Sequence, residues 1–164
     1  MMKVIIGIDN GLTGGLVAIS ASSGLIIERW VMPTQGKAKG NEVAGDSVLM
    51  FLDKWDRSDI TALLETPGKH SPGVQALCSM WDSFGAIRAV LETRGIRHHR
   101  IAPVTWQKAM LGNVEKGQTK PAALSKARQL WPDENWLATA RSSKPHEGLI
   151  DAALIAEYGR IKNL

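Results

Sequence analysis

The sequence predicts a single α/β domain built on a five-stranded mixed sheet flanked by helices, with three antiparallel strands first and two parallel strands after them. Two observations support this prediction. The first third of the chain consists of three short apolar segments separated by turns. The remainder alternates strand-like apolar segments with amphipathic helical ones. A length of 164 residues suits one domain, which we expect to span residues 1–164.

The three opening strands are expected over residues 3–9, 16–20 and 25–32. The first is an almost continuous run of apolar, largely β-branched residues, which is typical of a central strand buried on both faces. Turn-forming residues separate it from the second strand, and a serine- and glycine-containing turn separates the second from the third. Residues 33–40 are polar and contain Gly and Lys, so we expect a loop there.

Beyond residue 40 the hydrophobic period becomes that of helices. Apolar stripes predict helices over 48–55, 74–95, 103–111, 119–131 and 147–160, with strands over 60–65 and 96–102. The last helix has a packing face of small residues, Ala152, Ala153 and Ala156, beside Leu149.

The aromatic composition is unusual, with six tryptophans against one tyrosine and two phenylalanines. Trp55, Trp81 and Trp131 lie on apolar helical stripes, so we expect them to pack in the core, with a dimer contact as the alternative for Trp81. Trp106 and Trp136 are candidates for a subunit contact or for a platform on which DNA bases stack.

Composition excludes several classes of protein. Hydrophobic residues make up 44% and charged residues 22%, as in globular rather than disordered chains. The apolar stretches are too short to cross a bilayer, and no signal-peptide pattern opens the chain, so we expect a cytoplasmic protein with no membrane partner. With Cys78 as the single cysteine, neither an internal disulfide nor a cysteine-based zinc site can form.

The net charge of +4 is mild, but basic residues gather in the second half of the chain. The candidates for DNA contacts there are Arg97, Arg100, Lys108, Lys116 and Lys120. A basic half suits a polyanionic partner such as nucleic acid, although a solvated surface explains these charges equally well.

Three acidic residues lie in unusually apolar surroundings. Asp9 ends the first strand, Glu65 ends the strand over 60–65, and Asp151 interrupts an otherwise apolar helix. A carboxylate is costly to bury unless it is paired or binds a cation. If the two strands are neighbours their ends lie together, and the last helix would bring Asp151 to the same place. Glu147 lies one turn before Asp151 on the same helix face.

Such a cluster of like charges is stable only with hard cations bound, and Mg²⁺ or Mn²⁺ prefers oxygen ligands of this kind. Two ions held by Asp9, Glu65, Glu147 and Asp151 would activate a water and stabilise the leaving oxygen in phosphodiester hydrolysis. Each acid alone is compatible with an ordinary strand end or a solvent-facing helix position. The coincidence of three favours the metal site.

The same segments resemble those of RuvC-like Holliday junction resolvases. Residues 6–11 and 14–19 read Ile-Gly-Ile-Asp-Asn-Gly and Gly-Gly-Leu-Val-Ala-Ile, which is similar to the opening hairpin of that family. Leu-Leu-Glu at 63–65 resembles the second acidic strand, and 145–158 resembles the closing helix, especially in the short versions carried by phages and related bacteria. Segment 101–108 also resembles that family, as does Lys120 with the downstream Leu-Trp-Pro at 130–132. The resemblance therefore spans nearly the whole chain through short motifs in a characteristic order.

The resemblance implies a ribonuclease H-like fold, two Mg²⁺ or Mn²⁺ ions, a homodimer, and paired incisions in four-way DNA junctions by a crossover junction endodeoxyribonuclease. It matches Asp9, Glu65 and Asp151 with the metal-binding acids of the family. It also places Lys120 near the scissile phosphate, where a cation would stabilise the developing charge; an ordinary surface lysine is the alternative. The corresponding location is the cytoplasm of a bacterium or a phage-infected host.

The chain departs from the family at the fourth metal ligand. That ligand lies three residues before the last Asp, where this chain has Gly148. Glu147 is the favoured replacement because it fits the helix face, although a solvated Glu is also favourable at a helix N-terminus. His146 is the other candidate, since it could enter from the helix start and position a water.

A second departure concerns the residue that wedges into the junction. The family often has an aromatic after its second acidic strand, whereas this chain has none between Glu65 and Trp81. Lys69 and His70, in the loop that follows Glu65, are candidates for phosphate contacts.

Three alternative functions follow from the same pattern. A non-catalytic protein could bind branched nucleic acid with this fold, and a ribonuclease H-type nuclease could act on RNA–DNA hybrids, because substrate choice depends on surface shape. ATP-binding domains of the sugar-kinase or actin-like type also open with Gly-Ile-Asp-x-Gly. They need two such domains, which 164 residues cannot supply, so we expect no nucleotide cofactor.

Overall fold

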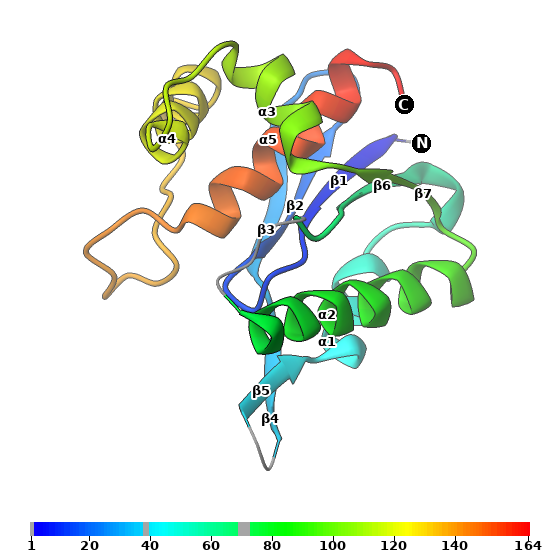
Figure 1. Cartoon of the computed structure of the whole chain (residues 1–164). Helices are drawn as coiled ribbons and strands as arrows, with labels where there is room; N and C mark the ends of the chain where they lie inside the picture. Colours follow the sequence, from blue (N-terminus) through cyan, green and yellow to red (C-terminus); the bar gives the residue numbers. More distant parts are fainter. Residues whose placement is uncertain (1, 38–39, 69–72) are drawn as a thin grey trace.

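A five-stranded sheet of order β3-β2-β1-β6-β7 forms the centre of the molecule. The structure is a computed structural model that describes residues 2–37, 40–68 and 73–164 (Figure 1). The strands are β1 (Val4–Asp9), β2 (Gly15–Ser20), β3 (Ile26–Val31), β6 (Ile60–Glu65) and β7 (Arg97–Ile101). The pairs β1–β2 and β2–β3 are antiparallel, and β1–β6 and β6–β7 are parallel. The predicted mixed sheet is therefore confirmed.

Helices cover both faces of this sheet (Figure 1). One face carries α3 (Pro103–Leu111), α4 (Thr119–Leu130) and α5 (Glu147–Ile161); the other carries α1 (Gly45–Leu52) and α2 (Val74–Thr93), and a 3-10 turn, η1 (Arg57–Asp59), precedes β6. Side chains alternate along each strand, so Ile5 packs in the core with α3, α4 and α5 while Val4 and Ile6 pack in the core with α1 and α2. The strand β1, predicted to be buried on both faces, therefore contributes to two cores.

The helix α5 lies unusually close to β1 and β2. A methyl group at Gly7 would lie 1.9 Å from the carbonyl oxygen of Ala152 and 2.5 Å from the backbone nitrogen of Ala156. The predicted small packing face, which includes Ala152 and Ala156, is fully buried in this contact. Glycine on the strand and alanine on the helix let the two backbones approach, and this approach sets the height of α5 over the strand ends.

A two-stranded hairpin takes in Thr34–Lys37 and Gly40, although a loop was predicted over residues 33–40. It pairs β4 (Thr34–Lys37) with β5 (Gly40–Val43) and projects from the main sheet (Figure 1). Gln35 donates a hydrogen bond to Glu42 across the hairpin at 2.9 Å. The prediction was wrong because Thr34, Gln35 and Gly36 are all exposed, so no apolar alternation marks this strand.

The tryptophan predictions were partly wrong. Trp131 is buried as expected, and Trp55 is partly buried against the second core. The prediction of a core position fails for Trp81, which is 50% exposed, because α2 buries only residues of its second half. Trp106 and Trp136, predicted at a contact surface, are both buried. Their exposure depends on which elements cover them, which helical periodicity does not report.

No helix among the residues that the structure describes is both long and apolar enough to span a membrane.

The close contact of α5 with β1 can be tested by adding one methyl group. Gly7→Ala should lower the free energy of unfolding by about 3 kcal/mol or more, because the new group meets backbone atoms that cannot rotate away. Urea denaturation would measure the loss. Gly85→Ala in α2 is the matched control, since no heavy atom lies within 4 Å of its added carbon; it should stabilise the protein by about 0.5–1 kcal/mol. A Gly7→Ala protein as stable as the wild type would contradict this packing.

Candidate active site

The strands β1 and β6 end side by side, and each ends in an acid. Ile8 pairs with Leu64 in the parallel ladder, so Asp9 and Glu65 are the next residues of neighbouring strands. Because side chains alternate, both acids face the side of the sheet that α5 covers, as Gly7 does two residues earlier.

One hydrogen bond joins the two strand ends beyond the ladder, and another orients the Asp9 carboxylate. The side-chain amide of Asn10 donates a hydrogen bond to the backbone carbonyl of Glu65. The backbone N–H of Gly11 donates to Asp9 Oδ1 at 3.2 Å. Asn10 is only 2% exposed, so its amide substitutes for the ladder hydrogen bonds that the diverging strands no longer make. The Asp9 and Glu65 backbones are thereby fixed relative to each other.

Asp151 reaches the same place from α5. Its neighbour Ala152 is the residue whose carbonyl lies against Gly7, so Asp151 lies over the end of β1. The charges of Asp9 and Asp151 both act on Glu65, and those of Asp9 and Glu147 act on Asp151. The structure therefore brings together the three acids that the sequence singled out, with Glu147 at the margin.

Burial raises the pKa values of all three carboxyl groups, and mutual repulsion adds to this at Glu65 and Asp151. Burial, followed by the charges of Asp9 and then Asp151, raises the pKa of Glu65 to about 8, although the hydrogen bond from Trp106 opposes the change. Burial, with Asp9 and Glu147, raises the pKa of Asp151 to about 7. Burial also raises the pKa of Asp9. All three cannot be ionised together at neutral pH without a compensating cation.

The donor set suits a hard divalent cation, but the side chains are not yet gathered around one point. Among the described residues, no group of three or more Asp, Glu, His or Cys side chains is already arranged to hold a metal ion. Carboxylates without a cation repel one another, so an open arrangement is expected of the free chain. Asp9, Glu65 and Asp151 offer only oxygen donors, which Mg²⁺ and Mn²⁺ prefer. They are the residues that would hold such an ion.

The packing explains why position 148 carries no ligand. A methyl group at Gly148 would lie 2.4 Å from the carbonyl oxygen of Thr13 and 2.5 Å from the Cα of Gly14. Any side chain there would force α5 away from the β1–β2 turn. The glycine is thus required by the contact between helix and turn.

Of the two residues proposed to replace that ligand, His146 already has a structural role. It is the N-cap of α5, and its Nδ1 accepts a hydrogen bond from the backbone N–H of Leu149 at 3.2 Å. Burial lowers the pKa of His146, which favours the neutral ring that this acceptor role needs. Glu147 is exposed and forms an ion pair with Lys120, with 2.5 Å between Oε2 and Nζ.

This ion pair places Lys120, in the first turn of α4, beside the start of α5. The hydrogen bond and charge of Glu147, and more weakly the charge of Asp151, raise the pKa of Lys120. Both partners are mostly exposed, at 73% for Lys120 and 57% for Glu147, so the pair contributes little to stability. It does keep an ammonium group at the edge of the acidic cluster.

The remaining basic candidates divide into two groups. Lys108 lines a shallow hollow between α3 and the start of α4, and Lys116 is exposed on the connecting loop. Arg100 pairs with Leu64, one residue before the end of β6. Arg97 pairs with Thr61 at the other end of β7 and is therefore not brought to the acids. Lys69 and His70 lie outside the described residues.

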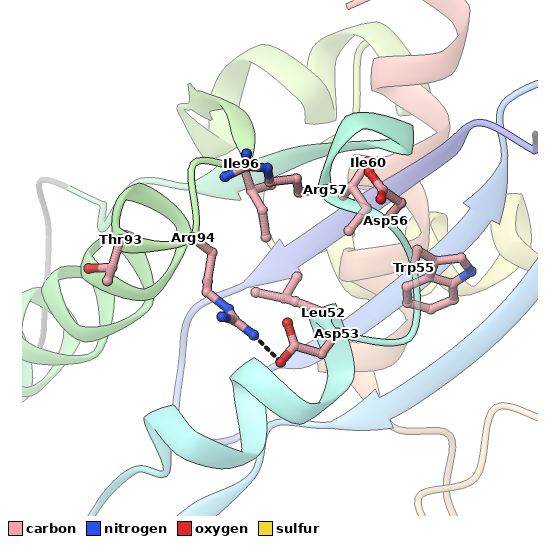
Figure 2. A pocket seen from close by; sticks show the side chains of 9 residues that line it. All are labelled: Leu52, Asp53, Trp55, Asp56, Arg57, Ile60, Thr93, Arg94 and Ile96. Carbon is pink, nitrogen blue, oxygen red and sulfur yellow. Dashed lines mark hydrogen bonds and ion pairs between the residues drawn. The ribbon is translucent and has the colours of Figure 1, made fainter.

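A hollow of about 360 Å³ lies near the starts of β6 and β7, at the opposite end of these strands from the acids (Figure 2). It is lined in part by Trp55, Arg57 and Ile60, the first residue of β6, whereas the acidic cluster is at the last. Asp53 and Arg94 form an ion pair across it. Asp56, which also lines it, accepts a hydrogen bond from the backbone N–H of Ser58 at 2.8 Å, so the strand ends remain the candidate site.

Sequence reasoning missed two close contacts of the site. Trp106 donates its indole N–H to Glu65 Oε1 at 2.6 Å. No pattern in the sequence predicts this contact, because it depends on how α3 turns back after β7. The hydrogen bond from Asn10 to the carbonyl of Glu65 was also missed, because it depends on the pairing of β1 with β6.

The raised pKa values predict how the stability of the metal-free protein depends on pH. The ordinary pKa values of Glu65 and Asp151 are 4.5 and 3.8, whereas in the folded protein their pKa values are raised to about 8 and about 7. Their protonated forms therefore stabilise the fold at low pH. This stability is lost as the pH rises through 7 and 8. Burial lowers the pKa values of His99 and His146 from 6.5. Below pH 6.5 these two residues therefore make the free energy of unfolding rise with pH.

In a chelator, the free energy of unfolding should therefore fall between about pH 6.5 and pH 8. Urea denaturation across this range would measure the slope. Glu65→Gln should flatten it, because the amide does not ionise, whereas Asp133→Asn at an exposed loop position should leave it unchanged. A free energy of unfolding that rises with pH over this interval would show that the pKa values of Glu65 and Asp151 are not raised in the folded protein.

Nearly the whole chain is similar to two solved structures of RuvC. The T. thermophilus RuvC in complex with Holliday junction substrate superposes with a TM-score of 0.66 at 16% identity, covering 99% of this chain and 95% of that one. The Thermus thermophilus RuvC structure superposes with a TM-score of 0.57 at 14% identity, covering 98% and 96%. No protein-family model and no curated protein matches the sequence. The chain thus has the ribonuclease H-like fold of RuvC over nearly its whole length.

Proposed function

We propose that this protein is a metal-dependent, structure-selective DNA endonuclease that resolves four-way or other branched junctions. The observation that carries the proposal is the meeting of Asp9, Glu65 and Asp151, from three separate elements, at the edge where β1 and β6 end. Fold similarity alone would not assign a chemistry. A structural neighbour described in complex with a Holliday junction substrate supports branched DNA as the substrate class.

The acidic residues of this site would bind cations, and basic residues would bind DNA. Two Mg²⁺ or Mn²⁺ ions bound there would supply the Lewis acidity that phosphodiester hydrolysis needs. Asp9, Glu65 and Asp151 would hold them, with Glu147 as the candidate for a fourth ligand. Because Glu65 and Asp151 retain protons near neutral pH, ion binding would release protons.

Basic residues beside the acids would bind the phosphate backbone. Lys120 lies at the margin of the acidic cluster, where its ammonium group would meet a phosphate and stabilise developing charge. Lys108 and Lys116 are exposed on α3 and on the loop after it. Arg100 is exposed on β7, but it pairs with Leu64, whose side chain packs in the core with α1 and α2, so Arg100 faces the other side of the sheet from the acids. Arg97 lies at the far end of β7, so its predicted DNA contact has no support from its position.

A homodimer belongs to the same proposal. A four-way junction offers two symmetry-related strands, so paired incisions require two sites. The first half of α2 exposes an apolar face on which Val74 is 80% and Trp81 50% exposed. A second copy packing on this face would bury both residues.

Cleavage of a synthetic four-way junction in Mg²⁺ or Mn²⁺ tests the nuclease. Loss of an outer partner of a metal ligand already costs about 10–100-fold, so Asp9→Asn should lower the cleavage rate by at least about 100-fold. Asp133→Asn makes the same chemical change at an exposed loop position and should leave the rate unchanged. An Asp9→Asn protein as active as the wild type would refute the assignment of the site.

A substrate panel in the same assay separates the alternative functions. Fork, flap and RNA–DNA hybrid substrates should be cut more slowly than the four-way junction. Preferential cleavage of the hybrid would instead indicate a ribonuclease H-type enzyme, and junction binding without any cleavage would indicate a non-catalytic binder.

The dimer can be tested independently of cleavage. Trp81→Glu places a charge on the exposed face of α2, so the protein should sediment as a monomer at concentrations where the wild type is a dimer. Ile161→Glu, at another exposed apolar position that is 47% exposed, should leave the dimer intact. Equal sedimentation of wild type and Trp81→Glu would exclude this face as the interface.

A further inference from the structure

One partner of the acidic cluster is a completely buried tryptophan. The Trp106 side chain is 0% exposed, yet its indole N–H reaches the half-buried Glu65 and donates to Oε1 at 2.6 Å. The donor therefore approaches Glu65 from the buried core. Glu65 Oε2 has no hydrogen-bond partner among the described residues.

The backbone around this contact is firmly held. Glu65 pairs with Ile101 at the end of β7, and α3, which carries Trp106, begins two residues later. The backbone N–H and the hydroxyl of Thr66 both donate to the carbonyl of Ile101, at 2.8 and 3.3 Å. The ring itself packs in the core with Met110. Neither the indole nor the strand end is free to move away.

We propose that Trp106 is a positioning residue for the divalent-cation site: its indole N–H holds Glu65 Oε1 so that Oε2 remains available to the metal ion. This inference rests on the proposed nuclease function. An indole N–H donates and cannot accept, so it holds the carboxylate without competing for the cation. A carboxylate fixed in this way loses less conformational freedom when an ion binds.

Another tryptophan shows that core packing alone does not require this contact. Trp131 is buried in the same core, but its indole N–H donates to the backbone carbonyl of Gly24 at 2.8 Å, away from the acids. Trp136, also buried there, has an indole N–H without a partner in the part of the chain that the structure describes. A carboxylate partner is therefore specific to Trp106, and Trp131 provides a matched control.

The test compares Trp106→Phe with Trp131→Phe. Both variants keep an aromatic ring in the same core and lose one indole hydrogen bond. Loss of an outer partner of a metal ligand costs about 10–100-fold in metal affinity, so Trp106→Phe should weaken Mn²⁺ binding by about tenfold or more. Calorimetric titration with Mn²⁺ alone would measure this, without DNA or turnover. Trp131→Phe should bind Mn²⁺ as the wild type does.

Cleavage at increasing Mn²⁺ gives a second comparison. The concentration for half-maximal cleavage should rise by about tenfold in Trp106→Phe, with most of the maximal rate recovered at saturation, because the metal ligands themselves are intact. Unchanged affinity in Trp106→Phe would overturn the positioning role and leave the nuclease proposal standing. An equal loss of Mn²⁺ affinity in Trp106→Phe and Trp131→Phe would show that Trp106 acts only through core packing. A wild-type protein that binds no Mn²⁺ would overturn both.

A spectroscopic measurement covers the case in which Trp106→Phe does not fold. In the ¹⁵N-labelled wild type, the Trp106 indole N–H signal should shift when Mg²⁺ is added, because the ion withdraws charge from the accepting carboxylate. The same signal should move in Glu65→Gln, while that of Trp131 stays in place in both experiments. A Trp106 signal insensitive to Mg²⁺ and to Glu65→Gln would overturn the inference.

Discussion

The close approach of α5 to the β1–β2 hairpin is the constraint on which the site depends. The carbonyl of Ala152 occupies the space where Gly7 would carry a side chain, and the Thr13–Gly14 turn occupies the corresponding space at Gly148. These contacts between backbones leave α5 no freedom to rise or slide. Asp151 is therefore delivered to the ends of β1 and β6 by packing, before any ion contributes.

Packing and electrostatics act in opposite directions at this point. The fold gathers Asp9, Glu65 and Asp151 in a partly dry place, where burial and repulsion raise their pKa values. The cost is met by the large cores on both sides of the sheet, and the neighbouring groups relieve only part of it. Trp106 donates to one carboxylate, and the charge of Lys120 reaches another. A bound cation would offset the remaining cost of burying these carboxylates together. The same close placement of the acids would therefore lower the stability of the protein without the ion and favour binding of the ion.

Much of the fold could be predicted because its signals are local. The apolar run of β1, the turns around β2 and the helical stripes each depend on a few consecutive residues, and the acids stood out against them. The hairpin of β4 and β5 was missed because solvent on both faces leaves no apolar period. The exposure of Trp81 and the burial of Trp106 and Trp136 depend on which elements lie above each helix or loop. The contact between Trp106 and Glu65 joins residues 41 apart in sequence, and only the path of α3 after β7 creates it.

The glycine at position 148 bears on whether the site is a working or a degraded one. Read from the sequence alone, a missing ligand suggests lost chemistry, but the structure gives Gly148 a packing reason that is independent of any ligand. The burial of Glu65 and Asp151 has no packing reason of this kind, although Trp106 donates a hydrogen bond to Glu65. Neutral side chains at Glu65 and Asp151 would remove the repulsion and the desolvation cost, so a protein that only bound DNA would be more stable without them. Acids held where they weaken the fold are what we would expect of the divalent-cation site that we propose.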